Sequence, residues 1–307
     1  MRIVALCGGV GGSKLILGLH HEFPHAELTV IVNTADDLTV LGLHVSPDLD
    51  TVMYTLAGLA NPATGWGIAS DTFECLQMAG RYGHDGWFRI GDRDLATHLT
   101  RTRALASGKT LTEATRELAA GLGVGRTLLP ITDGRVSTKV RVATGWLSFQ
   151  EYFVKRGHAD RPLEVAHQGI EDSSPTAEVK AALANADMII VAPSNPVVSI
   201  GPILATPGFR ECLVSASAPK VAMSPFIGRH AIAGPADALM VASRHEPTSE
   251  GLARMYAGWL DRLVVHEDDS DMVPAIEATG VSALATQTLM ADLEAKQRLA
   301  RFVVEAR

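Results

Sequence analysis

The stretch that decides the fold is Arg2-Ile3-Val4-Ala5-Leu6-Cys7-Gly8-Gly9-Val10-Gly11-Gly12-Ser13-Lys14. Its first six residues are a short, mostly apolar run with β-branched members, which is typical of a buried strand. A glycine-rich turn follows, and the apolar spacing of residues 15–19 predicts a helix. A second apolar run at 28–32 predicts a buried strand, so the chain opens with a βα unit of the Rossmann type.

The rest of the chain alternates between this pattern and a helical one. Further strands are predicted at 186–192, 220–223 and 262–266, and helices at 71–81, 95–106, 111–122, 176–185 and, largely, 284–306. Strand candidates are missing between 51 and 123, and short extended stretches lie between 126 and 150. We expect an α/β fold with a Rossmann-like parallel sheet, helices on both faces and a mainly helical inserted subdomain. The expected division is a nucleotide-binding core (1–50 and 186–307), the insertion (51–125) and a mixed connecting region packed on the core (126–185).

Length and composition restrict the class of protein. The 307 residues carry a net charge of −7, and 47% of them are hydrophobic, which suits one large domain or a main domain with a smaller one. The acidic balance, without clusters of Lys and Arg, argues against nucleic acid as a partner. No uninterrupted apolar run reaches 18 residues, and no basic stretch precedes the first strand. We therefore expect a cytoplasmic protein with no membrane partner.

The glycine loop from Gly8 to Lys14 is suited to binding phosphate. Glycines between a strand and a helix let backbone N–H groups approach phosphate oxygens, and the helix N-terminus adds partial positive charge. The loop lacks the GxxxxGK spacing of a P-loop and the last glycine of the GxGxxG dinucleotide motif. The alternative is a tight strand-to-helix turn that needs glycine only for its geometry.

Two acidic loops follow, from Asn33 to Asp37 and from Ser46 to Thr51. Their four carboxylates, Asp36, Asp37, Asp48 and Asp50, are hard to place in a core, so they indicate a metal ion, a phosphate-bearing substrate or both. A dinucleotide site would use one of them on a ribose and leave three unexplained. Diphosphate chemistry with Mg²⁺ explains more. Helix capping is the alternative for Asp48 and Asp50, and Asp48 is the one of the four that best suits a structural role.

Three more loops are rich in polar groups. Arg89 to Asp94 places two arginines and two aspartates around a glycine; the aspartates could cap the next helix, or an arginine could bind phosphate. The loops Pro193–Pro196 and Ser224–Gly228 follow predicted strands and should lie side by side at the carboxyl edge of the sheet. Neither a GxSxG elbow nor an HExxH motif is present, so the sequence offers no nucleophilic apparatus.

Taken in order, these loops resemble one enzyme family over essentially the whole chain. The set comprises Gly8 to Lys14, Asn33 to Asp37, Ser46 to Val52, Gly91 to Ala96, Phe149 to Phe153 and Pro193 to Pro196. It closely resembles the 2-phospho-L-lactate transferase family, whose members act in the biosynthesis of the deazaflavin coenzyme F-420 and in bacteria include phosphoenolpyruvate transferases.

The resemblance implies a Mg²⁺-dependent transfer between two small molecules. The donor would be the guanosine diphosphate ester of a phosphorylated three-carbon acid, and the acceptor the ribityl hydroxyl of 7,8-didemethyl-8-hydroxy-5-deazariboflavin, with release of GMP. The acid is left open among phosphoenolpyruvate, 2-phospholactate and 3-phosphoglycerate, and we favour phosphoenolpyruvate. The resemblance also implies a homodimer.

The same resemblance, with the loop chemistry, gives the expected site residues. Asp36, Asp37 and Asp50 are expected in catalysis, with Asp36 and Asp50 on the metal. The deazaflavin would contact Asp50, Arg89, Asp92 and Arg93. The nucleotide would lie against Gly9, Val10, Gly11, Gly12, Ser13, Lys14, Ser194, Asn195, Pro196 and Ser224. Arg229 departs from the smaller residue expected there in the family.

Two other functions stay open at this point. A related family of non-catalytic, nucleotide-sugar-binding regulatory proteins resembles the glycine loop and the first acidic loop, but not the segments 48–52, 91–96 and 149–153. A NAD-dependent oxidoreductase is the third possibility, and the incomplete glycine motif and surplus carboxylates count against it.

Overall fold

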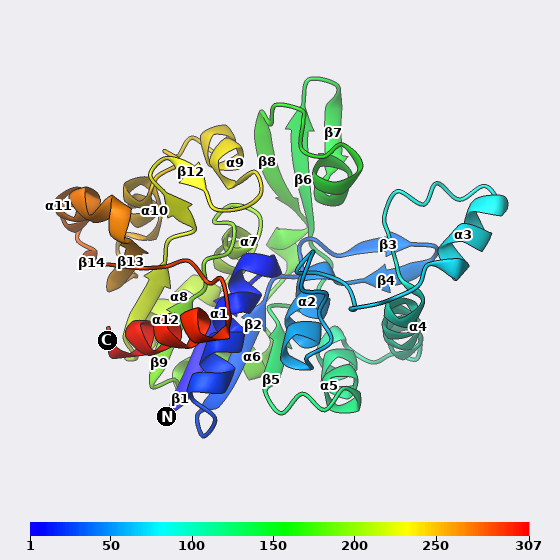
Figure 1. Cartoon of the computed structure of the whole chain (residues 1–307), viewed down its shortest axis with the longest axis horizontal. Coiled ribbons are helices and arrows are strands. Elements are labelled where there is room, and N and C mark those ends of the chain that lie inside the picture. Colours follow the sequence, from blue (N-terminus) through cyan, green and yellow to red (C-terminus); the bar gives the residue numbers. More distant parts are fainter. Residues whose placement is uncertain (307) are drawn as a thin grey trace.

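The computed structural model describes residues 1–306, and its centre is a seven-stranded parallel sheet (Figure 1). The strands are ordered β14 (Ser282–Thr286), β13 (Arg262–His266), β10 (Lys220–Met223), β9 (Met188–Val191), β1 (Arg2–Cys7), β2 (Glu27–Val32) and β5 (Thr127–Pro130). From β1 the chain builds the sheet toward β5, and from β9 it builds toward β14. The strand order therefore reverses between β1 and β9, and the crevice at their carboxyl ends is where open α/β sheets bind ligands.

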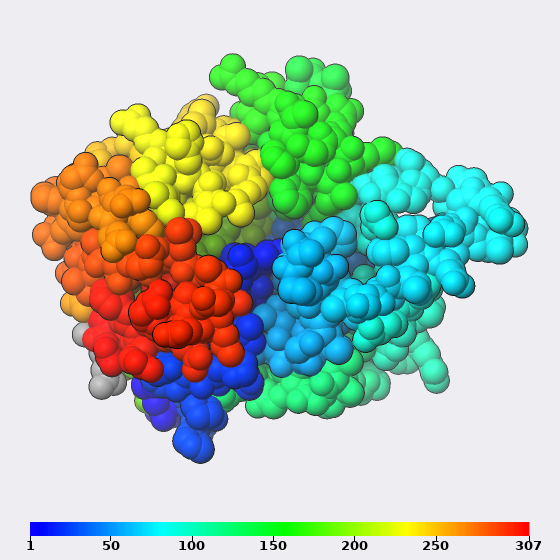
Figure 2. All heavy atoms as spheres, viewed as in Figure 1, coloured from blue at the N-terminus to red at the C-terminus, as the bar shows by residue number. Residues whose placement is uncertain are grey.

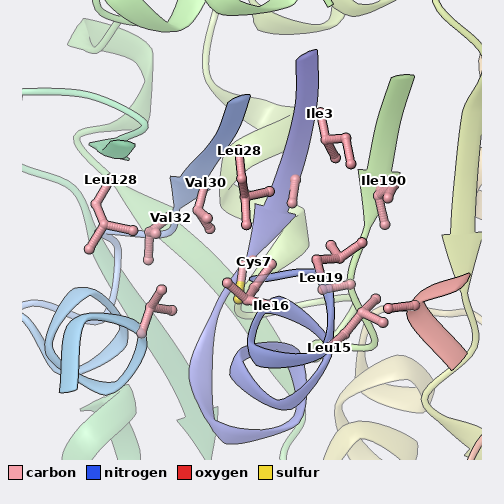
Figure 3. Packing of buried hydrophobic residues seen from close by; sticks show 14 of the residues in the cluster. Ile3, Cys7, Leu15, Ile16, Leu19, Leu28, Val30, Val32, Leu128 and Ile190 are labelled. Atoms are coloured by element: carbon pink, nitrogen blue, oxygen red, sulfur yellow. The ribbon is translucent and has the colours of Figure 1, made fainter. Parts of the chain in front are cut away.

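Helices cover both faces, as the sequence predicted. α1 (Gly9–Glu22), α2 (Pro47–Leu56), α5 (Leu111–Gly121) and α12 (Leu293–Glu305) pack on one face, and α6 (Ala177–Ala184), α7 (Ile200–Ala205), α8 (Phe209–Ser215), α10 (Ser249–Tyr256) and α11 (Val273–Glu277) pack on the other. Alternation along β1 sends Ile3 and Cys7 to the first core and Val4 to the second. Figure 3 shows α1 presenting Leu15 and Ile16 to the strands.

A helical arm, which we define as residues 57–106, extends from the sheet to one side (Figures 1 and 2). It contains α3 (Glu74–Arg81) and α4 (Asp92–Ala106). Within the described part of the chain, the only β pairing of this arm is an isolated bridge between Ala60 and Ile68, which agrees with the predicted lack of strands. A short hairpin of β3 (Leu38–Val40) and β4 (Leu43–Val45), which the sequence did not predict, lies before α2.

A β arm, residues 137–168, stands at the carboxyl edge of the sheet. Its antiparallel strands are β6 (Ser137–Val142), β7 (Gly145–Ser148) and β8 (Glu164–Gln168), with the π-helix η1 (Glu151–Lys155) between β7 and β8. The arm shares a core with the hairpin β11 (Phe226–Ile227) and β12 (His230–Ala231) and with α9 (Ala236–Ala242). The two arms touch where Lys155 Nζ lies 2.6 Å from Asp85 Oδ2 and over the ring of Trp87.

Two strands lie outside the segments predicted for the sheet. β5 comes from the predicted connecting region but pairs with β2 as an edge strand. β14 occupies the start of the stretch predicted as largely helical, and α12 begins only at Leu293. The short helices η2 (Ile170–Asp172) and η3 (Glu267–Met272) complete the described chain. Among residues 1–306, no helix has the length and apolar character needed to span a membrane.

Candidate active site

The glycine loop lies at the sheet crevice, where β1 passes directly into α1. Gly8 precedes the helix with no side-chain cap, and Gly9 has a φ of +64°, a conformation that favours glycine. The Gly8 N–H donates to Ser194 Oγ at 3.0 Å, which joins this loop to the loop after β9. The N-terminal N–H groups of a 14-residue helix therefore face the crevice, an arrangement suited to an anion.

The glycines are required by the close approach of three loops. A Cβ at Gly8 would lie 2.5 Å from Asp48 Oδ2, and one at Gly11 would lie 2.7 Å from the Pro193 carbonyl oxygen. At Gly12 it would collide with Ser194 Oγ and lie 2.7 Å from Cys7 Sγ. The glycine loop, the second acidic loop and the Pro193–Pro196 loop thus meet at one place, as their positions at strand ends predicted.

Asn33 holds the two acidic loops together. Its Nδ2 donates to Asp48 Oδ2 at 2.9 Å and to the Val198 carbonyl at 3.3 Å, and its Oδ1 accepts from the Ala35 N–H at 2.9 Å. The Asn33 side chain is fully buried. Its contacts with Asp48 and Val198 reach other segments, and its contact with Ala35 closes its own loop. The sequence alone gives Asn33 no role, although its position directly after a buried strand is a signal for one.

The first acidic loop contains three buried oxygen atoms without a hydrogen-bond partner: Thr34 Oγ1, Asp36 Oδ1 and Asp37 Oδ1. Buried polar atoms without partners cost free energy, and three within four residues mark a place where a ligand would supply contacts. The other oxygen of Asp37 is engaged, since it lies 2.8 Å from both His44 Nε2 and Ser46 Oγ. Asp37 is therefore held in place with one oxygen free.

The carboxylates of Asp36 and Asp48 share an environment that disfavours their negative charge. Burial raises the pKa of Asp36 well above its usual range, and the charges of Asp48 and Asp37 add to the shift. Burial raises the pKa of Asp48 to about 7, against the opposing hydrogen bond from Asn33. Burial also raises the pKa of Asp37, opposed by its contact with His44. A cation among these groups would favour their charged forms.

Mg²⁺ fits this donor set. Within residues 1–306, no three or more His, Cys, Asp or Glu side chains are arranged to hold a metal by themselves. Mg²⁺ in phosphate sites, however, uses one or two carboxylates and takes its remaining ligands from substrate oxygens and water. Asp36, with a buried oxygen that has no partner, is the best candidate ligand.

The carboxylate of Asp50 is already occupied by a protein partner, whereas we expected it to bind a metal ion and the deazaflavin. Both of its oxygens are bound by the Arg101 guanidinium, with Nη1 at 3.1 Å from Oδ2 and Nη2 in close contact with Oδ1. Its side chain is only 7% exposed, so the carboxylate is not free for a metal or for the deazaflavin in this structure. The capping alternative is also wrong, because α2 begins at Pro47 and Asp50 lies inside its first turn.

Two of the three residues predicted around Gly91 have structural contacts. Asp92 accepts from the Glu74 and Cys75 N–H groups at 3.0 and 2.9 Å, so it caps α3 and not α4, of which it is the first residue. The Arg93 guanidinium donates to the Ala69 carbonyl. Asp71 caps α4 in return, since it accepts from the N–H groups of residues 93 and 94 at 2.8 and 3.0 Å. Arg89 is exposed, and its guanidinium lies 4.3 Å from the Phe73 ring centroid.

The loops that we predicted to contact the nucleotide differ in how they lie relative to the crevice. Ser194 contacts the glycine loop directly, and Asn195 Oδ1 accepts from the Val197 and Val198 N–H groups, which fixes the Pro193–Pro196 loop. Ser224, in contrast, is fully buried, with its hydroxyl 2.8 Å from Ser249 Oγ and accepting from the Phe226 N–H. Ser224 therefore stabilises the loop after β10 through buried hydrogen bonds, and its side chain is not open to a nucleotide.

Asp269 is a buried residue that we did not predict. Its Oδ1 accepts from the Gly228 N–H at 2.6 Å, and its Oδ2 lies 3.5 Å from Ser249 Oγ. It fixes the same loop, which includes the exposed Arg229. Because Asp269 follows β13 in an acidic run, its sequence context alone suggested only a solvated helix start.

The fold and the loops define a Rossmann-like α/β protein with a glycine loop at a helix N-terminus beside carboxylates that, within residues 1–306, have no cationic partner. A family model described as 2-phospho-L-lactate transferase CofD matches residues 3–305. The chain belongs to this family and is a transferase.

Two relatives agree with this assignment, and a solved structure shares the fold. The chain is 43% identical to a phosphoenolpyruvate transferase of Streptomyces griseus, over 99% of this chain and 98% of that protein. It is 38% identical to a 2-phospho-L-lactate transferase of Methanococcoides burtonii, over 98% of both chains. A crystal structure of a UPF0052-family protein from Bacillus halodurans superimposes with a TM-score of 0.68 over 98% of this chain and 99% of that one; at 18% identity this similarity shows the fold alone.

Proposed function

We propose that this transferase acts in coenzyme F-420 biosynthesis. It moves a phosphorylated three-carbon acid from its guanosine diphosphate ester to the ribityl hydroxyl of 7,8-didemethyl-8-hydroxy-5-deazariboflavin and releases GMP. The observation that carries the proposal is the crevice between β1 and β9, where the N-terminus of α1 and the partnerless oxygens of residues 34–37 lie at one sheet edge. This pairing suits a diphosphate and its cation.

The donor diphosphate would lie against the glycine loop. Backbone N–H groups at the start of α1 would bind its oxygens, and the exposed Lys14 would add a positive charge. Asp36 would hold Mg²⁺ together with the phosphates. When bound, the ion neutralises charge that develops on the leaving phosphate. The Pro193–Pro196 loop, held rigid by Asn195, would contact the nucleoside.

The acceptor would approach from the helical arm. Arg89 is an exposed cation of this arm, and its guanidinium lies over the ring of Phe73. Asp37, held by His44 and Ser46, would orient the ribityl hydroxyl through its free oxygen and take its proton. The acceptor oxygen then forms a bond to the phosphorus of the three-carbon acid phosphate, and the bond from that phosphorus to the GMP oxygen breaks. Positioning and charge neutralisation suffice for this step, so no covalent nucleophile is required.

We propose phosphoenolpyruvate as the three-carbon acid. The supporting observation is the 43% identity to the enzyme of Streptomyces griseus, against 38% and 41% to the 2-phospho-L-lactate transferases of Methanococcoides burtonii and Methanopyrus kandleri. The three candidate acids differ by one double bond, one hydroxyl or one attachment point, so comparing their guanylated esters at equal concentration tests this choice.

A single reaction series tests the function. Purified protein would be mixed with the deazaflavin, Mg²⁺ and each guanylated donor, and GMP release would be followed together with conversion of the deazaflavin. We expect both products in equal amounts, and loss of turnover in Asp36→Asn or with chelator. Nucleotide binding without GMP release would instead favour a non-catalytic regulatory protein. The homodimer stays a prediction, which sedimentation velocity would test.

A further inference from the structure

The outer part of the helical arm, residues 73–89, is a weakly packed segment that we call the strap. It contains α3, which lies at the outer end of the arm (Figures 1 and 2). Each residue of the strap is exposed or half-buried. Because apolar packing holds such a segment only weakly, it can open locally at a small cost in free energy. The transfer reaction proposed above assigns contacts only to Phe73 and Arg89, at the two ends of the strap.

The two ends of the strap meet at a firm base. The Asp92 N–H donates to the Thr72 carbonyl at 2.8 Å, and the reciprocal caps of Asp71 and Asp92 join the same two segments of chain. Ile68, before the strap, and Ile90, after it, are both buried. A segment whose ends are joined in this way can move as one body about that junction.

Glycines make the far end of the strap adaptable. Gly83 and Gly86 follow α3 and have φ values of +91° and +37°. Glycine reaches such conformations without a Cβ clash, so the stretch that follows α3 can absorb the backbone rotations that a hinge motion needs.

The strap contacts the β arm through Lys155 of η1. Lys155 Nζ lies 2.6 Å from Asp85 Oδ2 and 5.6 Å from the centroid of the Trp87 ring. On its own arm this lysine is firmly based, because Tyr152 in the same short helix is fully buried in a core that includes Val198. The contact therefore joins a well-packed element to a weakly packed one.

This contact closes a ring of contacts that starts and ends at the glycine loop. A Cβ at Gly65, near the start of the helical arm, would collide with Val10, so the arm borders the glycine loop. On the other side, the β arm shares its core with Val198, and Ser194 in the same loop after β9 accepts from the glycine loop. The ring thus passes from the glycine loop through the helical arm, the β arm and the loop after β9, around the crevice.

The contact of Lys155 with Asp85 is the weak point of this ring. The two side chains are 44% and 69% exposed, whereas Ser194 and Val198 are buried. Exposed ion pairs and exposed cation–π contacts contribute little stability, and salt screens the ion pair. An opening of the ring therefore begins here, and the strap carries Arg89 with it as it turns about its base.

We propose that the strap is a lid on one side of the crevice and that Lys155, through Asp85 and Trp87, is its latch. The closed form is the one in this structure, with the ring complete. In the open form the strap separates from η1 and leaves that side of the crevice accessible. A weak, exposed latch suits a lid that must release at every turnover. That the lid admits the deazaflavin rests on the proposed function.

The first experiment measures the opening without any ligand. One spin label would be attached to the native Cys75, which is exposed on the strap, and the other to Ala143→Cys, in the exposed turn between β6 and β7. Cys212→Ser would remove the half-buried third thiol, and Cys7 is buried. Double electron–electron resonance would then report the distance between the two arms, and we expect one narrow distribution when the latch is intact.

Charge reversal at the latch should open the strap. Lys155→Glu places two negative charges together and should raise the share of long distances by about threefold or more. Lys155→Glu/Asp85→Lys, which exchanges the two charges, should restore the narrow distribution. Arg156→Glu is the matched control, because Arg156 pairs with Asp160 at 3.1 Å on its own arm, and it should change nothing. An unchanged distribution in Lys155→Glu, or the same change in Arg156→Glu, would overturn the proposal.

The second experiment tests what the lid admits. Stopped-flow fluorescence of the deazaflavin, with GDP bound to the protein, would give its association and dissociation rate constants. Because a lid slows entry and exit alike, both rate constants should rise by about threefold in Lys155→Glu, while GDP affinity stays within about twofold of the parent protein. Unchanged rate constants would overturn the assignment of the strap as a lid. Absence of deazaflavin binding to the parent protein would overturn the proposed function, and the distance measurement would still decide whether the latch exists.

Discussion

At the scale of single residues, the site is built from carboxylates in two electrostatic states. Asp50 is neutralised by Arg101, whereas Asp36 and Asp48 are buried near one another without a cation. Burial of an unpaired charge is costly, so Asp36 and Asp48 hold their protons more firmly than a carboxylate in water does. This cost is what a metal-bound diphosphate would relieve, because its cation restores the charged forms of the same groups.

Gly12→Ala should weaken both the fold and nucleotide binding. The new Cβ would collide with Ser194 Oγ and crowd Cys7, so the glycine loop and the Pro193–Pro196 loop must separate. We expect a loss of roughly 1–3 kcal/mol in unfolding free energy, measured in urea. GDP affinity, measured by calorimetry, should fall as well. Gly121→Ala, at the end of α5 with open space around it, is the control and should be neutral or slightly stabilising. Unchanged GDP affinity in Gly12→Ala would contradict the close approach.

The raised pKa of Asp48 predicts how stability depends on pH in the absence of metal. Between its usual pKa of 3.8 and about 7, the folded protein keeps a proton that the unfolded chain has released. Stability should therefore fall as pH rises through this window, by at most about 1.4 kcal/mol per pH unit for one such proton. Urea unfolding from pH 5 to 8 measures the slope, and Asp48→Asn should flatten it. A slope of the opposite sign, or one unaffected by the substitution, would show that Asp48 ionises normally.

The sequence was sufficient to find the loops of the site but not the partners of their side chains. Asp36, Asp37 and the glycine loop were predicted because loop residues after buried strands meet at one edge of a parallel sheet. Arg101 could not be predicted. It sits in an ordinary helical stretch 51 residues after Asp50, and only tertiary packing buries it. The same reason explains Asp92, whose capping target, α3, precedes it in the chain.

At the scale of elements, the helical arm depends on two reciprocal caps. Asp71 accepts from the first N–H groups of α4, and Asp92 accepts from the first N–H groups of α3. α3 buries none of its own residues, so apolar packing contributes little to its stability. The caps therefore decide whether this part of the arm is ordered.

Asp71→Ala should loosen the arm without unfolding the sheet. Loss of the cap at α4 should cost about 1 kcal/mol locally. Hydrogen exchange read by mass spectrometry should accelerate in residues 70–95 and stay unchanged in β1 and β9. Gln77→Ala, an exposed change on α3, is the matched control. Uniform acceleration over the whole chain would mean that the arm and the sheet unfold as one unit.

The elements were predicted unevenly, for physical reasons. β1 and β2 were found because inner parallel strands are continuous apolar runs. The β3–β4 hairpin was missed because its strands have three residues each and its turn is Leu41-Gly42, with φ values of +52° and +77°. A turn with two positive φ values is usually predicted from Asn-Gly or Asp-Gly in the sequence, and Leu-Gly does not predict it. β14 is an edge strand whose partial exposure weakens its apolar pattern, and β5, at the other edge, has only four residues.

At the scale of the whole molecule, elements from the two ends of the chain pack against each other. Helix α1 and the C-terminal helix α12 lie together on one face of the sheet, although both arms and the six other strands of this sheet separate them in sequence (Figure 1). The contact is close because Gly18 on α1 faces the backbone of Lys296 on α12. Gly18 lies nine residues after Gly9, or about 14 Å along the helix, so this contact is remote from the crevice.

Gly18→Ala should therefore reduce stability and leave binding intact. A Cβ there would lie 2.7 Å from the Lys296 carbonyl carbon, so α12 must move outward along its length. Alanine would otherwise favour a helix by about 1 kcal/mol, so the clash must exceed that gain. We expect a net loss of about 1–2 kcal/mol in unfolding free energy, with GDP affinity within twofold of the parent protein. Gly12→Ala, on the same helix, provides the comparison because it should lose both properties. If Gly18→Ala also lost GDP affinity, α1 would be transmitting the displacement of α12 to the glycine loop, and the two ends of the helix would be mechanically coupled.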